Sequence, residues 1–268
     1  MIKGYQDRWA VVTGASSGLG RCYALELARR GVDCVLVSLP DSGLDDVADE
    51  VRGLGVNCVT IEADITDRDA VIALCRRIAG TFDVFMLVNN AGTGGTRRFT
   101  DCSLEYIENI IRLNVMACTL MTHELVPVII RGGGGFVLNV SSMASFSPIG
   151  FKTVYPASKR FVMDFSRSLR QELSGTGVKV STVHPGAMRT NSEVTRRIER
   201  QGLAGRLSEQ SPEFVAVRSL DATFAGHAMI IPGLRNKLNF MLMKIIPSWI
   251  RLPLMSAVVS REITAGLR

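Results

Sequence analysis

Tyr155 and Lys159 are the two side chains in this sequence whose types and spacing best suit proton transfer. Four residues is close to one helical turn, so both side chains project from the same face of a helix. A phenol has a pKa of about 10 and is a poor acid or base at neutral pH. A nearby ammonium group favours the phenolate and lowers that pKa, which would allow the pair to exchange a proton with a carbonyl or hydroxyl oxygen. Taken alone, the same spacing also fits an exposed surface pair.

Two serines and two glycine-containing segments could complete such a site. Ser141 and Ser142 follow a short apolar run, and either hydroxyl could orient a carbonyl oxygen. The segment 13–20 reads T-G-A-S-S-G-L-G, where glycines permit a tight turn and a helix start offers free N–H groups to a phosphate. The alternative is a turn that only packs a helix on a strand. The segment 89–92, N-N-A-G, would let the chain pass close to a flat ligand, but is as often a simple turn.

The order of apolar segments predicts the scaffold that must position these residues. Short apolar runs alternate with longer helix-like segments, as in a parallel sheet with helices on both faces. The expected strands are 9–13, 34–38, 58–62, 84–88, 136–140, 178–183 and, less regularly, 228–231. The expected helices are 19–30, 44–54, 68–79, 103–130, 154–174 and 212–224. Such sheets bind ligands at the carboxyl ends of their strands, where the candidate segments lie.

Together these segments resemble the short-chain dehydrogenase/reductase family over roughly residues 8–190. The chain carries T-G-x-x-x-G-x-G, N-N-A-G, Y-x-x-x-K, a serine thirteen positions before the tyrosine (155 − 142) and a following P-G, in the family's order. The resemblance implies an α/β fold: a single Rossmann-type domain over residues 1–268, with a doubly wound parallel sheet of about seven strands. Within it, the polar stretch 187–211 is expected to form a substrate lid, and 235–268 a basic, apolar C-terminal extension.

The resemblance also implies an oxidoreductase that moves a hydride between NAD or NADP and a ketone or secondary alcohol. Tyr155 would give or take the proton, and Lys159 would lower the pKa of Tyr155 and bind the nicotinamide ribose. Ser142, rather than Ser141, would stabilise the developing oxyanion. Asn114 would hold a water that links Lys159 to solvent. The implied cofactor-binding residues are Gly14, Ser16, Ser17, Gly18, Leu19, Gly20, Ser38, Asp64, Ile65, Asn90, Ala91, Gly92, Tyr155, Lys159, Pro185, Gly186 and Thr190. No metal site is expected.

The choice between NAD and NADP depends on the residues after the second strand. An acidic residue there binds the ribose hydroxyls of NAD, and a basic residue nearby receives the extra phosphate of NADP. Ser38 takes the acidic position and Leu39 the position of the usual arginine, so both signatures are missing. The absence of a repelling carboxylate favours NADP, for which Arg21 could reach the phosphate. Asp41 keeps NAD open as the alternative.

The C-terminal third predicts the substrate class. The segment 231–238, I-P-G-L-R-N-K-L, resembles a subgroup that includes 17β-hydroxysteroid and 3-ketoacyl reductases, which implies a lipid-like, acyl or steroid-like substrate. Met143, Phe146, Ile149, Phe151 and Met188 could line an apolar cleft, or could be ordinary core. His184 lies outside the family's catalytic set and is interpreted as a packing residue.

Charge and composition limit the possible partners. The chain has a net charge of +6, and the whole excess lies in residues 188–268, which hold 12 basic and 6 acidic residues. This segment could touch a membrane surface, although a solvated helix face beside the lid is the simpler interpretation. A polar N-terminus and six scattered cysteines favour a cytoplasmic protein. No nucleic acid partner is expected, and the family resemblance implies a homo-dimer or homo-tetramer that associates through the helices 103–130 and 154–174.

Two alternatives to an active reductase remain open at this stage. A catalytically silent NAD(P)-binding regulator would use the same fold, although such relatives usually lose the tyrosine or the lysine. A sugar-nucleotide epimerase or dehydratase would need a shorter glycine motif and a larger C-terminal region than residues 188–268 offer.

Overall fold

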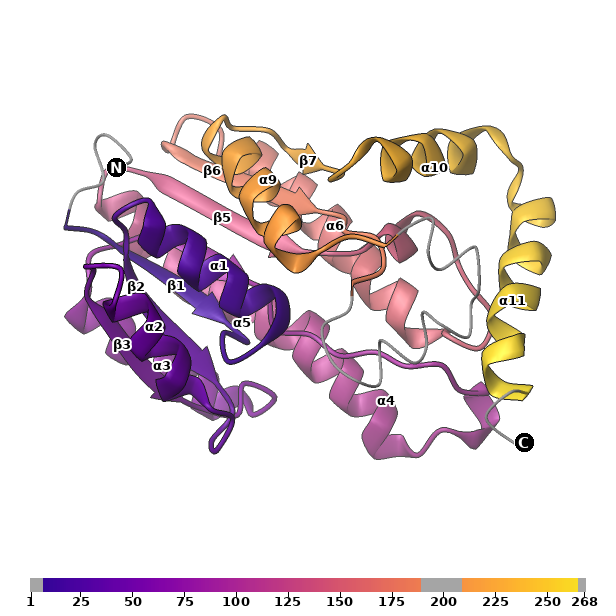
Figure 1. The fold of residues 1–268 in the computed structure, drawn as a ribbon, viewed down its shortest axis with the longest axis horizontal. Helices are drawn as coiled ribbons and strands as arrows, with labels where there is room; N and C mark the ends of the chain where they lie inside the picture. Colours follow the sequence, from indigo (N-terminus) through magenta and orange to yellow (C-terminus); the bar gives the residue numbers. More distant parts are fainter. Residues whose placement is uncertain (1–6, 189–208, 265–268) are drawn as a thin grey trace.

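A seven-stranded sheet forms the centre of the molecule, in a computed structural model that describes residues 7–188 and 209–264. All neighbouring strands are parallel, in the order β3-β2-β1-β4-β5-β6-β7 (Figure 1). The strands are β1 (Trp9–Thr13), β2 (Asp33–Ser38), β3 (Cys58–Glu62), β4 (Val84–Asn89), β5 (Gly135–Val140), β6 (Val178–Val183) and β7 (Met229–Ile230). The strand order reverses between β1 and β4, so a ligand crevice is expected at the carboxyl ends of these two strands.

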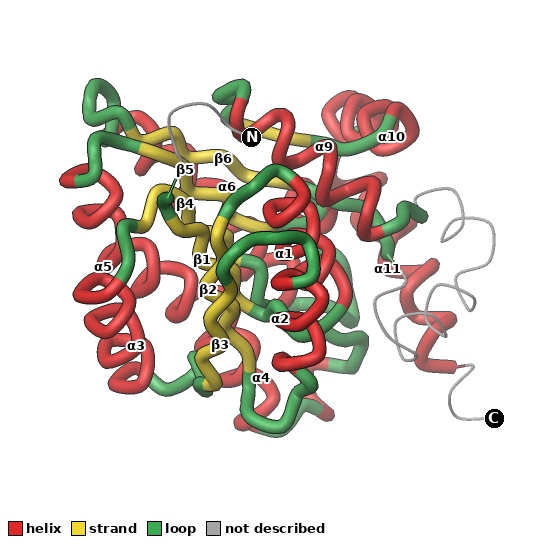
Figure 2. Tube along the Cα trace, turned by 60° about the vertical axis from the view of Figure 1, so that its left-hand side comes forward, coloured by secondary structure: helices red, strands yellow, loops and turns green. Residues whose placement is uncertain are grey.

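Helices cover both faces of the sheet, which confirms the predicted Rossmann-type fold (Figure 2). One face is covered by α1 (Gly18–Arg29), α2 (Leu44–Arg52) and α9 (Pro212–Phe224), and the other by α3 (Arg68–Thr81), α5 (Cys118–Arg131) and α6 (Val154–Glu172). The remaining helices are α4 (Leu104–Ile111), α10 (Leu234–Ile245) and α11 (Ser248–Thr264). Because β4 and β5 are buried along their whole length, their sequences do not alternate between apolar and polar residues but are mostly apolar, apart from Asn89 and Asn139.

The stretch predicted as one long helix over 103–130 has a different local structure. Helix α4 passes into a π-helical turn over Arg112–Ala117, and α5 begins at Cys118. A π-helical turn contains about one more residue per turn than an α-helix, so it changes the direction of a side chain. Here the turn includes Asn114, which is buried. By length and composition the helical stretch Leu104–Arg131 could cross a membrane, but half of its most apolar window is buried inside the protein.

The C-terminal segment contains less strand than expected and is mostly helical. The expected strand 228–231 is only two residues long, as β7, and the expected basic, apolar extension contains two helices separated at Pro247. Most of the predicted lid, residues 189–208, lies outside the described residues, as does Thr190. At the edges of this stretch, Met188 forms an isolated parallel bridge with Gln210.

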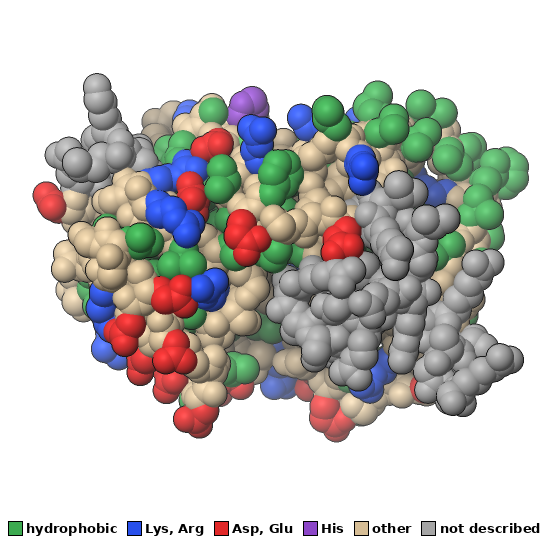
Figure 3. Space-filling model, in the orientation of Figure 1, with side chains coloured by type: hydrophobic (Ala, Val, Ile, Leu, Met, Phe, Trp, Pro, Cys, Tyr) green, Lys and Arg blue, Asp and Glu red, His purple; other side chains and the backbone are tan. Residues whose placement is uncertain are grey.

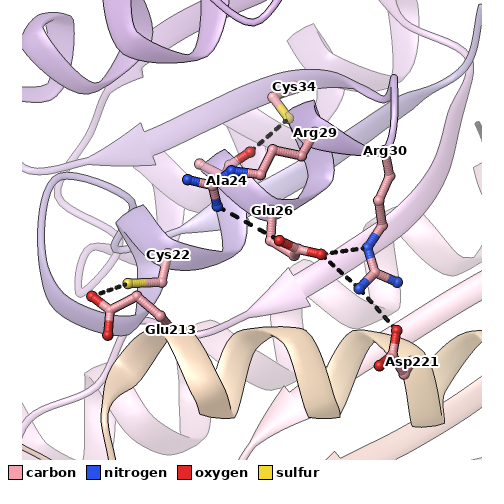
Figure 4. Close-up of polar contacts among 8 residues, drawn as sticks. All are labelled: Cys22, Ala24, Glu26, Arg29, Arg30, Cys34, Glu213 and Asp221. Atoms are coloured by element: carbon pink, nitrogen blue, oxygen red, sulfur yellow. Dashed lines mark hydrogen bonds and ion pairs between the residues drawn. The ribbon is translucent and has the colours of Figure 1, made fainter.

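Helix α9 is held against α1 by a small group of charged residues (Figure 4). Nη2 of Arg30, the residue that ends α1, lies 2.7 Å from a carboxylate oxygen of Glu26 and 2.9 Å from one of Asp221 on α9. The Arg30 guanidinium also lies 5.6 Å from the centre of the Phe224 ring. Arg29 makes a longer contact of 3.6 Å with Glu26 and is more exposed.

We expect Arg30→Ala to lower the free energy of unfolding by about 1–2 kcal/mol, because two carboxylates lose a shared charged donor and the ring loses its cation. The matched control is Arg29→Ala, which removes a more exposed arginine and should cost less than about 0.5 kcal/mol. Urea denaturation of both variants measures the difference. Equal losses would show that Arg30 does not join α9 to α1.

Candidate active site

The segment after β1 forms a close turn that leads directly into α1. Gly14 and Gly18 have φ values of +65° and +53°, in the region that favours glycine. A Cβ on Gly14 would lie 3.0 Å from the backbone of Ala91, and a Cβ on Gly20 would collide with the carbonyl oxygen of Gly14. Ser17 is the N-cap of α1 but makes no side-chain capping bond, so the first N–H groups of the helix suit an anionic group. These features fit the pyrophosphate of a dinucleotide.

Asn90 joins the ends of β1 and β4. Its amide nitrogen Nδ2 donates to the carbonyl oxygens of Thr13 at 2.9 Å and Gly14 at 3.2 Å. The Thr13 hydroxyl oxygen accepts from the backbone N–H groups of Asn90 and Ala91, both at 3.1 Å. These bonds hold the N-N-A-G segment against the glycine turn, at the point where the strand order reverses.

Asn114 connects the loop after β4 to α6. Its Oδ1 accepts from the backbone N–H of Thr93 at 2.9 Å, and its Nδ2 donates to the Thr93 carbonyl oxygen at 2.8 Å and to Oγ of Ser158 at 3.0 Å. The Ser158 hydroxyl donates in turn to the Tyr155 carbonyl oxygen at 2.8 Å. Sequence reasoning missed Ser158 and Thr93 as partners, although a polar residue in an apolar helix was a signal that Asn114 needed some.

Lys159 is almost fully buried, with 5% of its surface exposed. Its ammonium nitrogen donates to the carbonyl oxygen of Val140, the last residue of β5, at 3.0 Å. Burial lowers the pKa of Lys159 from its ordinary 10.5 to about 8. A Cβ on Gly92 would lie 2.9 Å from this nitrogen and 3.1 Å from Oδ1 of Asn114, so glycine allows the loop, the lysine and the asparagine to meet.

The Tyr155 ring lies against the same loop. A Cβ on Gly94 would overlap this ring, so the absence of a side chain there leaves room for the phenol. Tyr155 also lines a small pocket with Phe99, Tyr106 and Phe151. The loop after β4 therefore contacts Tyr155, Lys159 and Asn114, and the structure brings these three predicted residues to one place.

The two serines after β5 differ in their surroundings. The Ser141 hydroxyl is buried and donates to the carbonyl oxygen of Lys159 at 2.8 Å, so it binds the backbone of α6. The Ser142 hydroxyl oxygen accepts from the N–H of Ala144 at 3.1 Å, where it caps a short 3-10 helix over Met143–Phe146. An oxygen that accepts this bond can still donate its own proton, which suits Ser142 better than Ser141 for contact with a substrate.

His184 is fully buried behind Ser142. Its Nδ1 lies 3.0 Å from Oγ of Ser145, whose hydroxyl donates to the Ser142 carbonyl oxygen at 2.7 Å. The imidazole lies 4.6 Å from the ring of Phe146, and burial lowers the pKa of His184 to about 4. A neutral, buried histidine that packs at a tilt against Phe146 agrees with the predicted packing role.

The remaining predicted cofactor residues lie along the carboxyl edge of the sheet. Oγ of Ser38 lies 2.8 Å from Oγ of Ser16, so the end of β2 contacts the glycine turn. The Asp64 carboxylate accepts from the backbone N–H of Thr66 at 2.9 Å and from its hydroxyl at 2.7 Å. Ile65 is buried.

Two further contacts lie beyond this edge. The Pro185 carbonyl oxygen accepts from the N–H of Met143 at 3.0 Å, and the Gly186 N–H donates to Oε1 of Gln210 at 3.3 Å. Gln210 was not among the predicted residues. Arg21, the candidate for an NADP phosphate, forms an ion pair with Glu50 on α2.

Known proteins are similar in sequence or structure to most of this chain. Residues 8–201 match the family described as short chain dehydrogenase. An uncharacterised oxidoreductase of Myxococcus xanthus is 37% identical over 70% of this chain and 75% of its own. The ketoacyl reductase HetN of Nostoc sp. is 34% identical over 78% of this chain and 74% of its own. A short-chain dehydrogenase of Sphingobium yanoikuyae in complex with NADPH superposes with a TM-score of 0.76 at 31% identity, over 90% of this chain and 96% of that one. The chain belongs to the short-chain dehydrogenase family of oxidoreductases.

Proposed function

We propose that this protein is an NADP-preferring reductase of hydrophobic ketones, with Tyr155 as the proton donor. The observation that carries the proposal is the buried Lys159 ammonium, which shares the loop after β4 with Tyr155 and Asn114. A buried cation stabilises a nearby phenolate and so lowers the pKa of the phenol that must release a proton. The reverse reaction, oxidation of a secondary alcohol, uses the same residues.

Each residue of the candidate site has a separate role in the proposed reduction. A nicotinamide cofactor, when bound, would supply the hydride for this reduction. Tyr155 gives its proton to the carbonyl oxygen, and Ser142 donates a hydrogen bond to that oxygen as negative charge develops. Lys159 holds the ribose and stabilises the phenolate that Tyr155 becomes. Asn114 holds the loop against α6 through its bonds to Thr93 and Ser158, and would hold the water that links Lys159 to solvent.

The small pocket beside Tyr155 has a partly aromatic lining, which favours an apolar substrate. Its walls include the aromatic rings of Phe99, Tyr106 and Phe151, and Phe99 is 56% exposed. Of the five apolar residues considered from the sequence, Met143 and Ile149 are buried, so they support the core. The name of the Nostoc ketoacyl reductase agrees with a 3-ketoacyl type of substrate. Residues 187–211 are proposed to cover this substrate within the single domain.

A homo-dimer or homo-tetramer is also part of the proposal. Phe161 on α6 is 42% exposed and stacks on Phe165 at 5.9 Å, while Met116 beside α5 is 44% exposed. Large apolar side chains on these outer faces support an interface there.

Tyr155→Phe removes the donated proton but keeps the ring. We expect kcat/KM for reduction of a hydrophobic ketone to fall about 100-fold or more, with NADPH binding little changed. The control is Tyr23→Phe, because the Tyr23 hydroxyl bonds Ser219 at 2.8 Å between α1 and α9 and takes no part in the candidate site. If Tyr155→Phe turns over normally, Tyr155 is not the acid. If the unchanged protein binds NADPH but reduces no ketone in a broad panel, the silent regulator is correct.

Lys159→Met should abolish turnover. In the absence of cofactor, the same variant should be more stable to unfolding than the unchanged protein. The pKa of Lys159 is about 8 when folded and 10.5 ordinarily, so folding opposes its protonation. This penalty is fully present below pH 8, shrinks as the pH rises towards 10.5 and vanishes above it. We expect a gain of about 1–3 kcal/mol in unfolding free energy at pH 7. Denaturation at pH 7 and pH 10 tests this, and a loss of stability at pH 7 would contradict it.

Ser38→Asp should move the cofactor preference towards NADH. A carboxylate at the end of β2 can bind the ribose hydroxyls of NAD and repels the phosphate of NADP. We expect the ratio of kcat/KM for NADPH over NADH to fall about tenfold or more. Ser42→Asp adds the same charge four residues later and should leave the ratio nearly unchanged. An unaltered ratio in Ser38→Asp would remove Ser38 from the cofactor site.

A further inference from the structure

Helix α10 carries a row of large apolar side chains on its outer surface. Exposed fractions are 83% for Leu234, 61% for Leu238, 53% for Met241, 45% for Leu242 and 72% for Ile245. The spacing places all five on one side of the helix. The opposite side faces the protein, because Asn236 is buried and the ring of Phe240 lies 4.5 Å from that of Phe146. The helix is therefore amphipathic, with its apolar side turned outward.

The apolar surface continues into the first turns of α11. Trp249 is 75% exposed, and Ile250, Leu252 and Leu254 are exposed as well. In Figure 3 hydrophobic side chains gather at the upper right of the molecule, over α10 and the turn into α11. We call the exposed residues between Leu234 and Leu254 the α10–α11 face. Apolar surface concentrated in this way marks a binding site for another apolar surface.

Basic residues border the apolar row, and the sequence of α10 and of the first turns of α11 contains no acidic residue. Three exposed cations lie on α10: helical geometry places Lys237 and Lys244 along one border of the row and Arg235 along the other. In the sequence, no acidic residue occurs between Asp221 and Glu262. A partner for this face must therefore bring both apolar and negatively charged groups.

We propose that the α10–α11 face binds the surface of an anionic phospholipid bilayer. The apolar row would enter the boundary between headgroups and acyl chains, while the lysines and the arginine contact lipid phosphates. A second copy of the chain fits less well, because a twofold contact through this face would oppose like charges with no acidic residue to pair them. The proposal does not depend on the reaction, since binding is measured without substrate.

This face lies directly behind the loop that carries Ser142. Phe240 of α10 contacts Phe146 of that loop, and Oγ of Ser256 on α11 accepts from the Gly150 N–H at 2.8 Å. A bilayer bound to the outer side of these helices would lie next to the segment that contains Ser142, Phe146 and Gly150. An apolar ketone dissolved in the bilayer would then have a short path to Tyr155.

The experiment uses the full chain and vesicles of phosphatidylcholine, with or without phosphatidylglycerol. We expect co-sedimentation with the mixed vesicles and little with phosphatidylcholine alone. Trp249 fluorescence should shift to shorter wavelength on binding, whereas the other tryptophan, Trp9, is already packed on Phe82 with ring centres 4.6 Å apart. The double variant Lys237→Glu/Lys244→Glu should bind the mixed vesicles about tenfold more weakly or worse.

Ile245→Glu should weaken binding to a similar extent, and its control is Leu104→Glu. Leu104 is 73% exposed at the start of α4, so the control places the same charge at an equally exposed site away from the face. The control should bind as the unchanged protein does. Circular dichroism spectra that match the unchanged protein establish that each variant is folded.

Three results would overturn the proposal. The first is equal binding to vesicles with and without phosphatidylglycerol. The second is a loss of binding in Leu104→Glu as large as in Ile245→Glu. The third is an oligomer, seen by light scattering, that Ile245→Glu dissociates while the unchanged protein binds no vesicles, because the face would then be an interface between copies of the chain.

Discussion

The buried ammonium of Lys159 is the constraint on which the arrangement of this site depends. A charged group with 5% of its surface exposed needs nearby acceptors, and the carbonyl oxygen of Val140 supplies one at 3.0 Å. That bond draws α6 onto the carboxyl end of β5. The space for the ammonium exists because Gly92 has no side chain, and the loop that contains Gly92 is held by Asn114. The buried ammonium of Lys159 therefore determines how the end of β5, α6 and the loop after β4 pack together.

A second polar layer below the ammonium supports this arrangement. The amide of Asn89 on β4 donates to Thr122 on α5 at 2.9 Å and to Asn139 on β5 at 2.8 Å, and Asn139 donates to Ser166 on α6 at 2.8 Å. These buried bonds can form in only one register of the two strands and two helices. Buried polar groups that are fully paired favour a single packing, because any slip would leave an amide without a partner. The layer thus keeps α6, and with it Tyr155 and Lys159, in a fixed position over the sheet.

Sequence reasoning succeeded where an apolar pattern or a motif determines the structure locally. The predicted bounds of β1, β3, β6 and α9 equal the observed ones, because each is a run bordered by clear turn or cap residues such as Ser211. It failed at the π-helical turn, because an apolar helix with one extra residue in a turn has nearly the same periodicity as a regular one. The partners of Asn114 were missed for a related reason: Thr93 and Ser158 are distant in sequence and meet it only through the fold.

A chain of contacts connects the inner side of α10 to the candidate site. The ring of Phe240 lies 4.5 Å from that of Phe146, which lies 4.6 Å from the imidazole of His184. His184 contacts Ser145, and Ser145 binds the carbonyl oxygen of Ser142. With a pKa of about 4, His184 stays neutral at physiological pH, so these contacts are packing rather than charge interactions. Because the role proposed for Ser142 requires its hydroxyl to point at a substrate oxygen, the position of α10 would affect the geometry of the proposed reaction.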